Sequence, residues 1–112
     1  MRQWFKARML RIYVTEADTW QGKPLFEEVL AKCLELGIAG ATVFRGVEGF
    51  GASARIYHAR SLSLSRDAPI MVVIIDTEDQ IEKLLPHLDA MIGGGLVASS
   101  IVDALRLDKS DC

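Results

Sequence analysis

Two glycine-rich segments are the parts of this sequence whose residue types best fit ligand chemistry. Gly49-Phe50-Gly51 follows a short β-branched and aromatic run, and Gly93-Gly94-Gly95 follows an apolar pattern with helical spacing. Glycine has no Cβ, so backbone N–H groups in such segments can approach a phosphate closely. Each segment alone is equally well explained as a loop tip or a helix terminator. Two of them in one short chain favour a phosphate site.

A polar stretch holding Trp20, Gly22 and Lys23 is a further candidate. An indole in such a loop either stacks on a nucleobase or covers the core, and Lys23 would lie near phosphate. Both roles of Trp20 remain open at this point.

Catalytic and metal-binding groups are harder to find. His58 and His87 have no histidine, cysteine or carboxylate three or four residues away, which favours surface histidines over metal ligands. Glu16 and Asp18 fit a polar loop after a strand, and Cys33 lies on an apolar helical stripe. We therefore expect a binding protein and not an enzyme, with no required cofactor and no metal site.

The hydrophobic pattern predicts four strands. Apolar and polar residues alternate over Met9–Val14, the period of a half-buried strand. The Ile70–Ile75 run is apolar throughout, as in a central strand covered on both faces. Two further strands are predicted at Ala41–Phe44 and Leu96–Leu107.

Two segments have helical spacing. The first starts at Pro24, which suits a first helical turn, and ends at Gly37. The second starts with a capping box made by Thr77 and Gln80. Pro86 lies inside it at a cost of about 3 kcal/mol, which predicts a kink or local tightening.

The segment 46–68 between the second and third strands is too long for an ordinary hairpin turn. We expect a long flexible loop there, without regular pairing at its start. Ser61, Ser63 and Ser65 alternate with leucines, which favours a short strand inside it. Loops of this length in compact domains usually carry function.

The order strand, helix, strand, strand, helix, strand predicts one ferredoxin-like α+β domain over residues 1–112. Right-handed crossovers place both helices on one face of a four-stranded antiparallel sheet. The other face needs a cover, and for so small and apolar a chain another copy is the simplest one. We therefore expect a closed homo-oligomer.

Composition limits the remaining possibilities. At 112 residues and 50% hydrophobic content, the chain suits one domain with one core. Its 13 basic and 15 acidic residues are spread along the sequence and leave no stripe of charge for nucleic acid. No signal peptide or membrane-spanning stretch is evident, which predicts a soluble cytoplasmic protein. Cys33 and Cys112 lie far apart, so no disulfide framework is expected.

The ordered motifs of this chain resemble those of a known family. Leu36-Gly37-Ile38, Gly40, Thr42-Val43, Val47 and Gly49-Phe50-Gly51 resemble the signature of PII signalling proteins, and Ile92-Gly93-Gly94-Gly95 is similar to that family's second glycine loop. Gly22-Lys23-Pro24-Leu25 and the segment 40–46 are closer still to uncharacterised PII-like proteins. The resemblance covers nearly the whole chain, from Met9 to Leu107.

This resemblance implies a homotrimer with adenine nucleotide in the clefts between subunits. A mobile loop would report occupancy to a partner protein, possible partners including a membrane transporter or channel. Arg106 falls at a phosphate-contacting position, and Thr42 would contact the ribose or base. The full set of implied nucleotide-binding residues is Lys23, Thr42, Gly49, Phe50, Gly51, Gly93, Gly94, Gly95 and Arg106.

Departures from the PII pattern indicate which nucleotide is bound. Ala52 and Ser53 stand where PII proteins have arginine and glutamine, and Leu96 replaces a lysine that reaches the outer phosphates. Each lost charge-assisted contact is worth about 1.5–3 kcal/mol, which favours AMP or ADP over ATP with 2-oxoglutarate. Tyr57 lies at a different offset from the tyrosine that is uridylylated in some PII proteins, so that modification is not expected.

Two other functions remain as alternatives. The chain also resembles the CutA copper-tolerance proteins, which implies a trimer that binds divalent metal through His58, His87 or Cys112. A nucleotide-processing enzyme is the third hypothesis, and the absence of an identifiable base and nucleophile counts against it.

Overall fold

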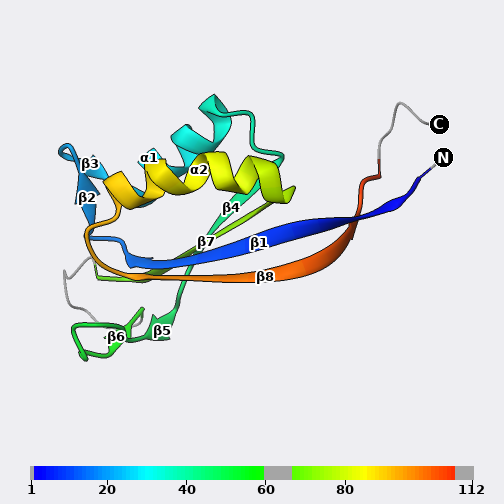
Figure 1. The fold of residues 1–112 in the computed structure, drawn as a ribbon. Coiled ribbons are helices and arrows are strands. Elements are labelled where there is room, and N and C mark those ends of the chain that lie inside the picture. The colour runs from blue at the N-terminus through cyan, green and yellow to red at the C-terminus, as the bar shows by residue number, and fades with distance from the viewer. Residues whose placement is uncertain (1, 60–66, 108–112) are drawn as a thin grey trace.

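The computed structural model describes residues 2–59 and 67–107, which form two helices packed on one face of a four-stranded sheet (Figure 1). The sheet consists of β1 (Trp4–Thr15), β4 (Gly40–Arg45), β7 (Pro69–Asp76) and β8 (Leu96–Leu105). The helices are α1 (Leu25–Glu35) and α2 (Glu78–Met91). All sheet pairings are antiparallel, in the order β4-β7-β1-β8. This architecture confirms the predicted ferredoxin-like α+β fold.

The core lies between the sheet and the helices, and strand and helix periods both contribute to it. Alternate residues of β1 and β7 point toward the helices, while residues at helical spacing on α1 and α2 point back. The residues that fill this layer are Leu10, Ile12, Val14, Leu25, Val29, Cys33, Ile70, Val72, Ile74, Ile81, Leu84, Leu88 and Met91. Removing this apolar surface from water is the main force that holds the layers together.

The start of α2 is fixed by polar contacts that the sequence only partly indicates. The Thr77 hydroxyl accepts a hydrogen bond from the Gln80 N–H at 3.4 Å, which is one half of the predicted capping box. The other half is absent, because the Gln80 side chain donates to the Gly37 carbonyl at 3.4 Å. The buried carboxylate of Asp76 accepts from the Thr77 N–H at 2.7 Å and from the Ala39 N–H at 2.8 Å. Asp76 thereby ties the end of β7 to the loop before β4. The helix runs on through Pro86, whose side chain is exposed.

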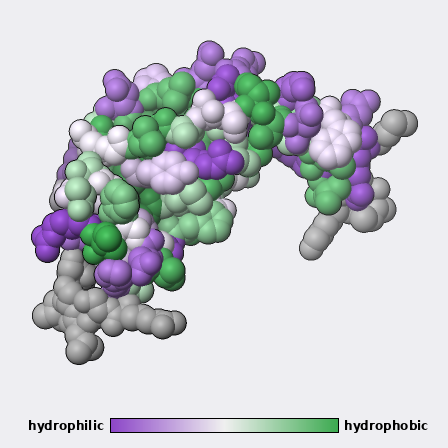
Figure 2. Space-filling model, turned by 90° about the horizontal axis from the view of Figure 1, so that it is seen from below, coloured by the Kyte–Doolittle hydropathy of each residue, from purple (hydrophilic) through white to green (hydrophobic). Residues whose placement is uncertain are grey.

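The opposite face of the sheet carries no helix. Residues on this face, which we call the open face, alternate with the core residues along each strand. They are Ala7, Met9, Arg11, Tyr13, Thr42, Phe44, Met71, Val73, Ile75, Leu96, Ala98, Ser100 and Val102. Figure 2 looks onto this side of the molecule, where hydrophobic residues cover much of the surface. β7 is central, as predicted, yet within one chain only its core side is fully buried.

β1 and β8 continue together beyond the rest of the sheet. β1 pairs with β7 only from Arg8 onward, whereas its pairing with β8 begins at Trp4. The residues Trp4–Ala7 and 102–105 therefore form a two-stranded ribbon that projects from the sheet (Figure 1), and the molecule is 52 Å long. The predicted start of β1 at Met9 is wrong because Ala7 and Arg8 interrupt the apolar alternation.

Four short strands lie outside the main sheet. β2 (Thr19–Trp20) and β3 (Lys23–Pro24) form the turn before α1. β5 (Glu48–Gly49) pairs with β6 (Tyr57–His58) in a small hairpin inside the segment expected to lack regular pairing. The predicted strand at 61–65 lies outside the described residues. Within residues 2–59 and 67–107, no helix has the length and apolar character needed to cross a bilayer.

Candidate functional site

A cavity of about 450 Å³ lies at the end of the sheet where β1 meets the turn before β8. One wall comes from the β5–β6 hairpin and the other from the glycine turn before β8. Its lining residues are Tyr13, Val14, Thr15, Asp18, Gly49, Phe50, Gly51, Ala52, Ser53, Arg55, Asp67, Pro69, Ile70, Gly94 and Gly95. The two glycine segments singled out from the sequence thus meet in one cavity, although more than 40 residues separate them, from Gly51 to Gly94.

The hairpin wall is held against the sheet by Pro69, the first residue of β7. The Gly46 N–H donates to the Pro69 carbonyl at 2.7 Å. A Cβ on Gly46 would lie 2.8 Å from Pro69 Cγ, and one on Gly49 would lie 3.3 Å from the same atom. Both glycines therefore allow the chain to fold back closely over β7, and this packing requirement accounts for them.

The glycines of the second wall differ from one another. Gly95 has φ +136°, and a Cβ there would lie 2.6 Å from the Tyr13 carbonyl oxygen, so this residue fixes the turn against β1. A Cβ on Gly93, Gly94 or Gly51 would meet nothing within 4 Å. Packing within the chain does not explain these three glycines, and Gly51 and Gly94 border the cavity.

Charged residues of the cavity wall were mostly missed by the sequence analysis. Arg55 lines the cavity, and its guanidinium makes no hydrogen bond or ion pair with any residue that the structure describes. Asp18 and Asp67 also line it, and Asp18 accepts a hydrogen bond from the Thr15 N–H at 2.8 Å. Arg55 reaches the wall because the chain turns at Ala54, which has φ 58° and donates to the Gly51 carbonyl. No sequence motif marks that turn.

Glu16 and Asp18 have structural roles, as the polar-loop interpretation predicted. Glu16 forms an ion pair with Arg45 at the end of β4, and its N–H donates to the Ala68 carbonyl at 2.9 Å. Asp18 closes the turn after β1. The two carboxylates do not form a pair that could act as a general acid and a general base.

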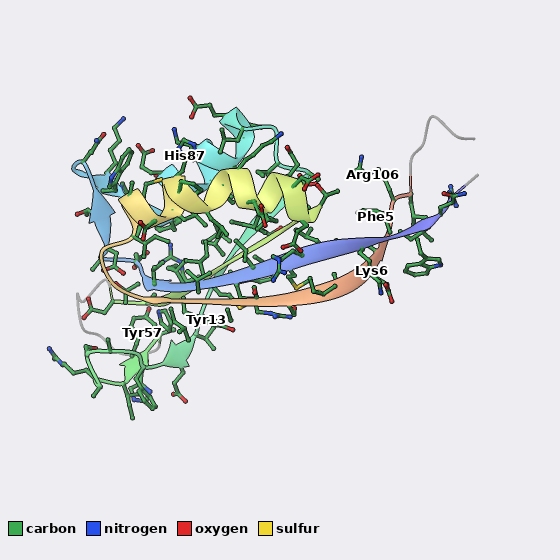
Figure 3. The ribbon with its side chains drawn as sticks, viewed as in Figure 1. Phe5, Lys6, Tyr13, Tyr57, His87 and Arg106 are labelled. Carbon is green, nitrogen blue, oxygen red and sulfur yellow. The ribbon has the colours of Figure 1, made fainter. Side chains whose placement is uncertain are left out.

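The remaining predicted nucleotide-binding residues lie outside this cavity. Lys23 is exposed in the β2–β3 turn, Thr42 is exposed on the open face of β4, and Gly93 immediately precedes the lining residue Gly94. Arg106 lies at the far end of β8 (Figure 3), whereas Tyr13 lies at the cavity end. Within one chain, Arg106 is therefore remote from the glycine segments.

The structure shows what surrounds the side chains of Trp20 and Cys33. Trp20 packs against the hydrophobic core, which supports the covering role over base stacking. Cys33 is buried, and burial raises the pKa of its thiol to about 11, so it is protonated and unreactive near neutral pH.

The histidines do not form a metal centre with the residues around them. His58 Nδ1 lies 2.7 Å from a Glu48 carboxylate oxygen across the β5–β6 hairpin, and His87 is half-buried on α2. Over residues 2–59 and 67–107, no three histidine, cysteine or acidic side chains are grouped so that they could hold a metal ion. Cys112 lies outside this part of the chain.

Comparison with solved structures defines the class of protein. CPII, a nitrogen regulatory PII-like protein from Thiomonas intermedia K12 bound to ADP, AMP and bicarbonate, superposes with a TM-score of 0.65 at 21% identity, over 93% of this chain and 92% of CPII. CutA1 from Oryza sativa gives a TM-score of 0.57 at 11% identity, over 95% of this chain and 86% of CutA1. At these identities the likeness establishes a shared fold, and this chain has the fold of the PII-like proteins.

Sequence comparison then identifies the family. The profile of the DUF190 family, described as "Uncharacterized ACR, COG1993", matches residues 7–104. A UPF0166 protein of Aquifex aeolicus (strain VF5) is 32% identical over 102 residues, covering 91% of this chain and 96% of the relative. The chain belongs to the DUF190 family. The resemblance to uncharacterised PII-like proteins is thereby confirmed.

Proposed function

We propose that this protein is a PII-like regulator that binds an adenine nucleotide, preferentially AMP or ADP, in clefts between the subunits of a homotrimer. The observation that carries the proposal is the convergence of Gly49-Phe50-Gly51 and Gly94-Gly95 on one cavity of about 450 Å³. Small-molecule sites typically have volumes of about 300–1,000 Å³, so a mononucleotide fits this space.

The backbone N–H groups and the charged side chains of the cavity both suit a ligand with one or two phosphate groups. Gly51 and Gly94 leave free space where a Cβ would otherwise stand, which lets their backbone N–H groups approach phosphate oxygens. The Arg55 guanidinium can form a bidentate contact with phosphate. Asp18 in the same wall repels additional negative charge, which supports AMP or ADP over ATP.

Assembly explains why four of the proposed contacts are absent from the cavity of a single chain. Arg106 lies at the opposite end of β8, so only a second copy can bring it to this cavity. We assign Lys23, Thr42 and Gly93 to the same composite site, with Thr42 on the ribose or base. The uncovered sheet face supports such an assembly, because its apolar residues need a partner surface.

The related structure supports the choice of ligand. CPII, which shares this fold, was crystallised with ADP, AMP and bicarbonate. In the present chain, the corresponding ligand would be held by the hairpin wall and the glycine turn. Binding of a nucleotide without its conversion fits a regulatory role and requires no catalytic residue.

Signalling would follow from the position of the binding residues in the hairpin. Gly51, Ser53 and Arg55 belong to the segment 46–68 and also line the cavity. A nucleotide that contacts these residues has a higher affinity for one conformation of the hairpin than for others. This difference in affinity increases the population of the conformation that it prefers. A partner protein, such as a membrane transporter or channel, then binds the favoured arrangement.

Isothermal titration calorimetry on nucleotide-stripped protein tests the proposal, with AMP, ADP, ATP and cyclic AMP as ligands. Arg55→Ala removes a charge-assisted contact worth about 1.5–3 kcal/mol, so AMP affinity should fall about 10- to 100-fold. Lys83→Ala, at an exposed position on α2 outside the cavity, is the matched control. Absence of saturable binding by every nucleotide would refute the proposed function.

The likeness in fold to CutA1 of Ehrlichia chaffeensis, described as a divalent ion tolerance protein, supports divalent-metal binding as a second candidate. Copper should then raise the melting temperature, a chelator should reverse the effect, and His58→Ala should abolish it. A melting temperature that copper leaves unchanged would eliminate this candidate.

A further inference from the structure

One charged side chain stands out on the open face of the sheet. Among residues 2–59 and 67–107, Arg11 is the only charged residue on the face defined above, and the others are apolar, small or hydroxyl-bearing. It lies in β1, one of the two central strands, opposite Val73 of β7 and Ala98 of β8. A cation is therefore placed in the middle of a largely uncharged surface.

The immediate surroundings of Arg11 provide no counter-charge. Its cross-strand and same-strand neighbours on this face include Met9, Tyr13, Val73 and Ala98, and none is acidic. The guanidinium makes no hydrogen bond or ion pair with any residue that the structure describes, although Arg11 is already half-buried in the single chain. Surface arginines usually project into water, whereas this one lies within an apolar face.

Covering the face would make this charge costly. Moving an unpaired ion out of water carries a penalty of several kcal/mol, which a close counter-ion must offset. The proposed assembly covers the open face with copies of the same chain. If open faces meet, each copy contributes a further Arg11, and none of the open-face residues that the structure describes is acidic.

We propose that assembly of this protein through its open face creates a binding site for a small oxyanion, with Arg11 of each copy as its ligand. A guanidinium matches the geometry of two oxyanion oxygens at once. The hydroxyls of Tyr13, on the same strand, and Ser100, diagonally opposite on β8, are the uncharged donors nearest in register. Inorganic phosphate has the required chemistry. The inference rests on the proposed assembly and not on the nucleotide cavity.

Anion-dependent assembly is the measurable consequence. A ligand that binds only the assembled protein favours assembly by mass action. In wild-type protein, millimolar inorganic phosphate should lower the subunit dissociation constant at least about ten-fold relative to a gluconate buffer of equal ionic strength. Sedimentation equilibrium measures that dissociation constant. If the subunits bind too tightly for it to be measured, the melting temperature at a fixed protein concentration provides a second measurement.

Variants of Arg11 separate an anion ligand from other roles. Arg11→Met keeps an apolar stem and removes the charge, so it should assemble equally in both buffers. Arg11→Lys keeps the positive charge but lacks the planar guanidinium, so phosphate should still favour its assembly, although less than that of the wild type. Lys83→Met, at an exposed position on α2 away from the open face and the cavity, is the matched control for loss of a cation and should respond to phosphate as the wild type does. Arg55→Ala measures the part of the phosphate response that comes from the cavity.

Three outcomes would overturn the inference. An equal phosphate response in wild type and Arg11→Met would place the anion elsewhere. Weaker assembly of Arg11→Met in both buffers would mean that Arg11 pairs with an acceptor on the partner copy. A wild-type protein that stays monomeric in both buffers would show that copies do not cover this face. AMP calorimetry on the same samples distinguishes these failures from failure of the nucleotide site.

Discussion

Gly95→Ala should strongly destabilise this protein, whereas Gly94→Ala should not. Gly95 has φ +136°, a conformation that residues with a Cβ rarely adopt, and the new Cβ would lie 2.6 Å from the Tyr13 carbonyl oxygen. Backbone strain of this kind costs about 1–3 kcal/mol. Relieving a clash with the backbone of a central strand adds about 1–3 kcal/mol. We expect a total loss of about 2–6 kcal/mol in the free energy of unfolding.

Thermal unfolding followed by circular dichroism measures this loss. For a domain near 100 residues, each kcal/mol lowers the melting temperature by about 4–8 °C, so Gly95→Ala should unfold roughly 10–50 °C below the wild type. A Cβ on Gly94 meets nothing within 4 Å, so that variant should change stability by less than about 0.5 kcal/mol. All samples need one protein concentration, because assembly also raises the melting temperature. Equal stability of the two variants would refute the argument.

Two further predictions concern ionisable groups. Because burial raises the pKa of the Cys33 thiol to about 11, a thiol reagent at pH 8 should modify Cys33 far more slowly in the native protein than in urea; equal rates would contradict its burial. The Lys32 ammonium, 2.7 Å from the Glu35 carboxylate, lowers the pKa of that carboxyl, so Lys32→Ala should raise it in a carboxyl NMR titration and Lys6→Ala should not. Since the folded-state pKa is depressed, the stabilisation from this pair is present above the ordinary glutamate pKa and is lost as pH falls through the folded value.

Much of the fold could be predicted because local patterns and tertiary packing agree. The alternation in β1 and the helical stripes contain the side chains that the structure buries in the core. The apolar run in β7 predicted a central strand, although only alternate residues of it are buried within one chain. The start of β1 could not be predicted in this way. Its first residues pair with β8 alone, and their more buried positions, Phe5 and Ala7, lie on the opposite face from Leu10, so the apolar period changes phase within the strand.

The candidate site was only partly predictable for a different reason. Glycines are visible in a sequence, and the two segments that line the cavity were identified from them. Arg55 enters the wall through a turn at Ala54, an alanine with positive φ, and no residue preference signals that turn. The separation of Arg106 from the cavity depends on the length of β8, and the predicted strand Leu96–Leu107 exceeded the observed strand by only two residues.

The pairing of β1 with β8 sets the separation between the cavity and Arg106. It runs without interruption from Tyr13 opposite Leu96 to Trp4 opposite Leu105, and Gly95 and Arg106 directly flank the two ends of β8. At about 3.3 Å per residue, this ladder spans roughly 30 Å. Inserting one residue into β8 would turn Arg106 to the other face, and inserting two would restore the face but displace it by about 7 Å. In the proposed assembly, the length of β8 therefore determines, in steps of two residues, the distance at which a neighbouring copy must be placed for its arginine to reach this cavity.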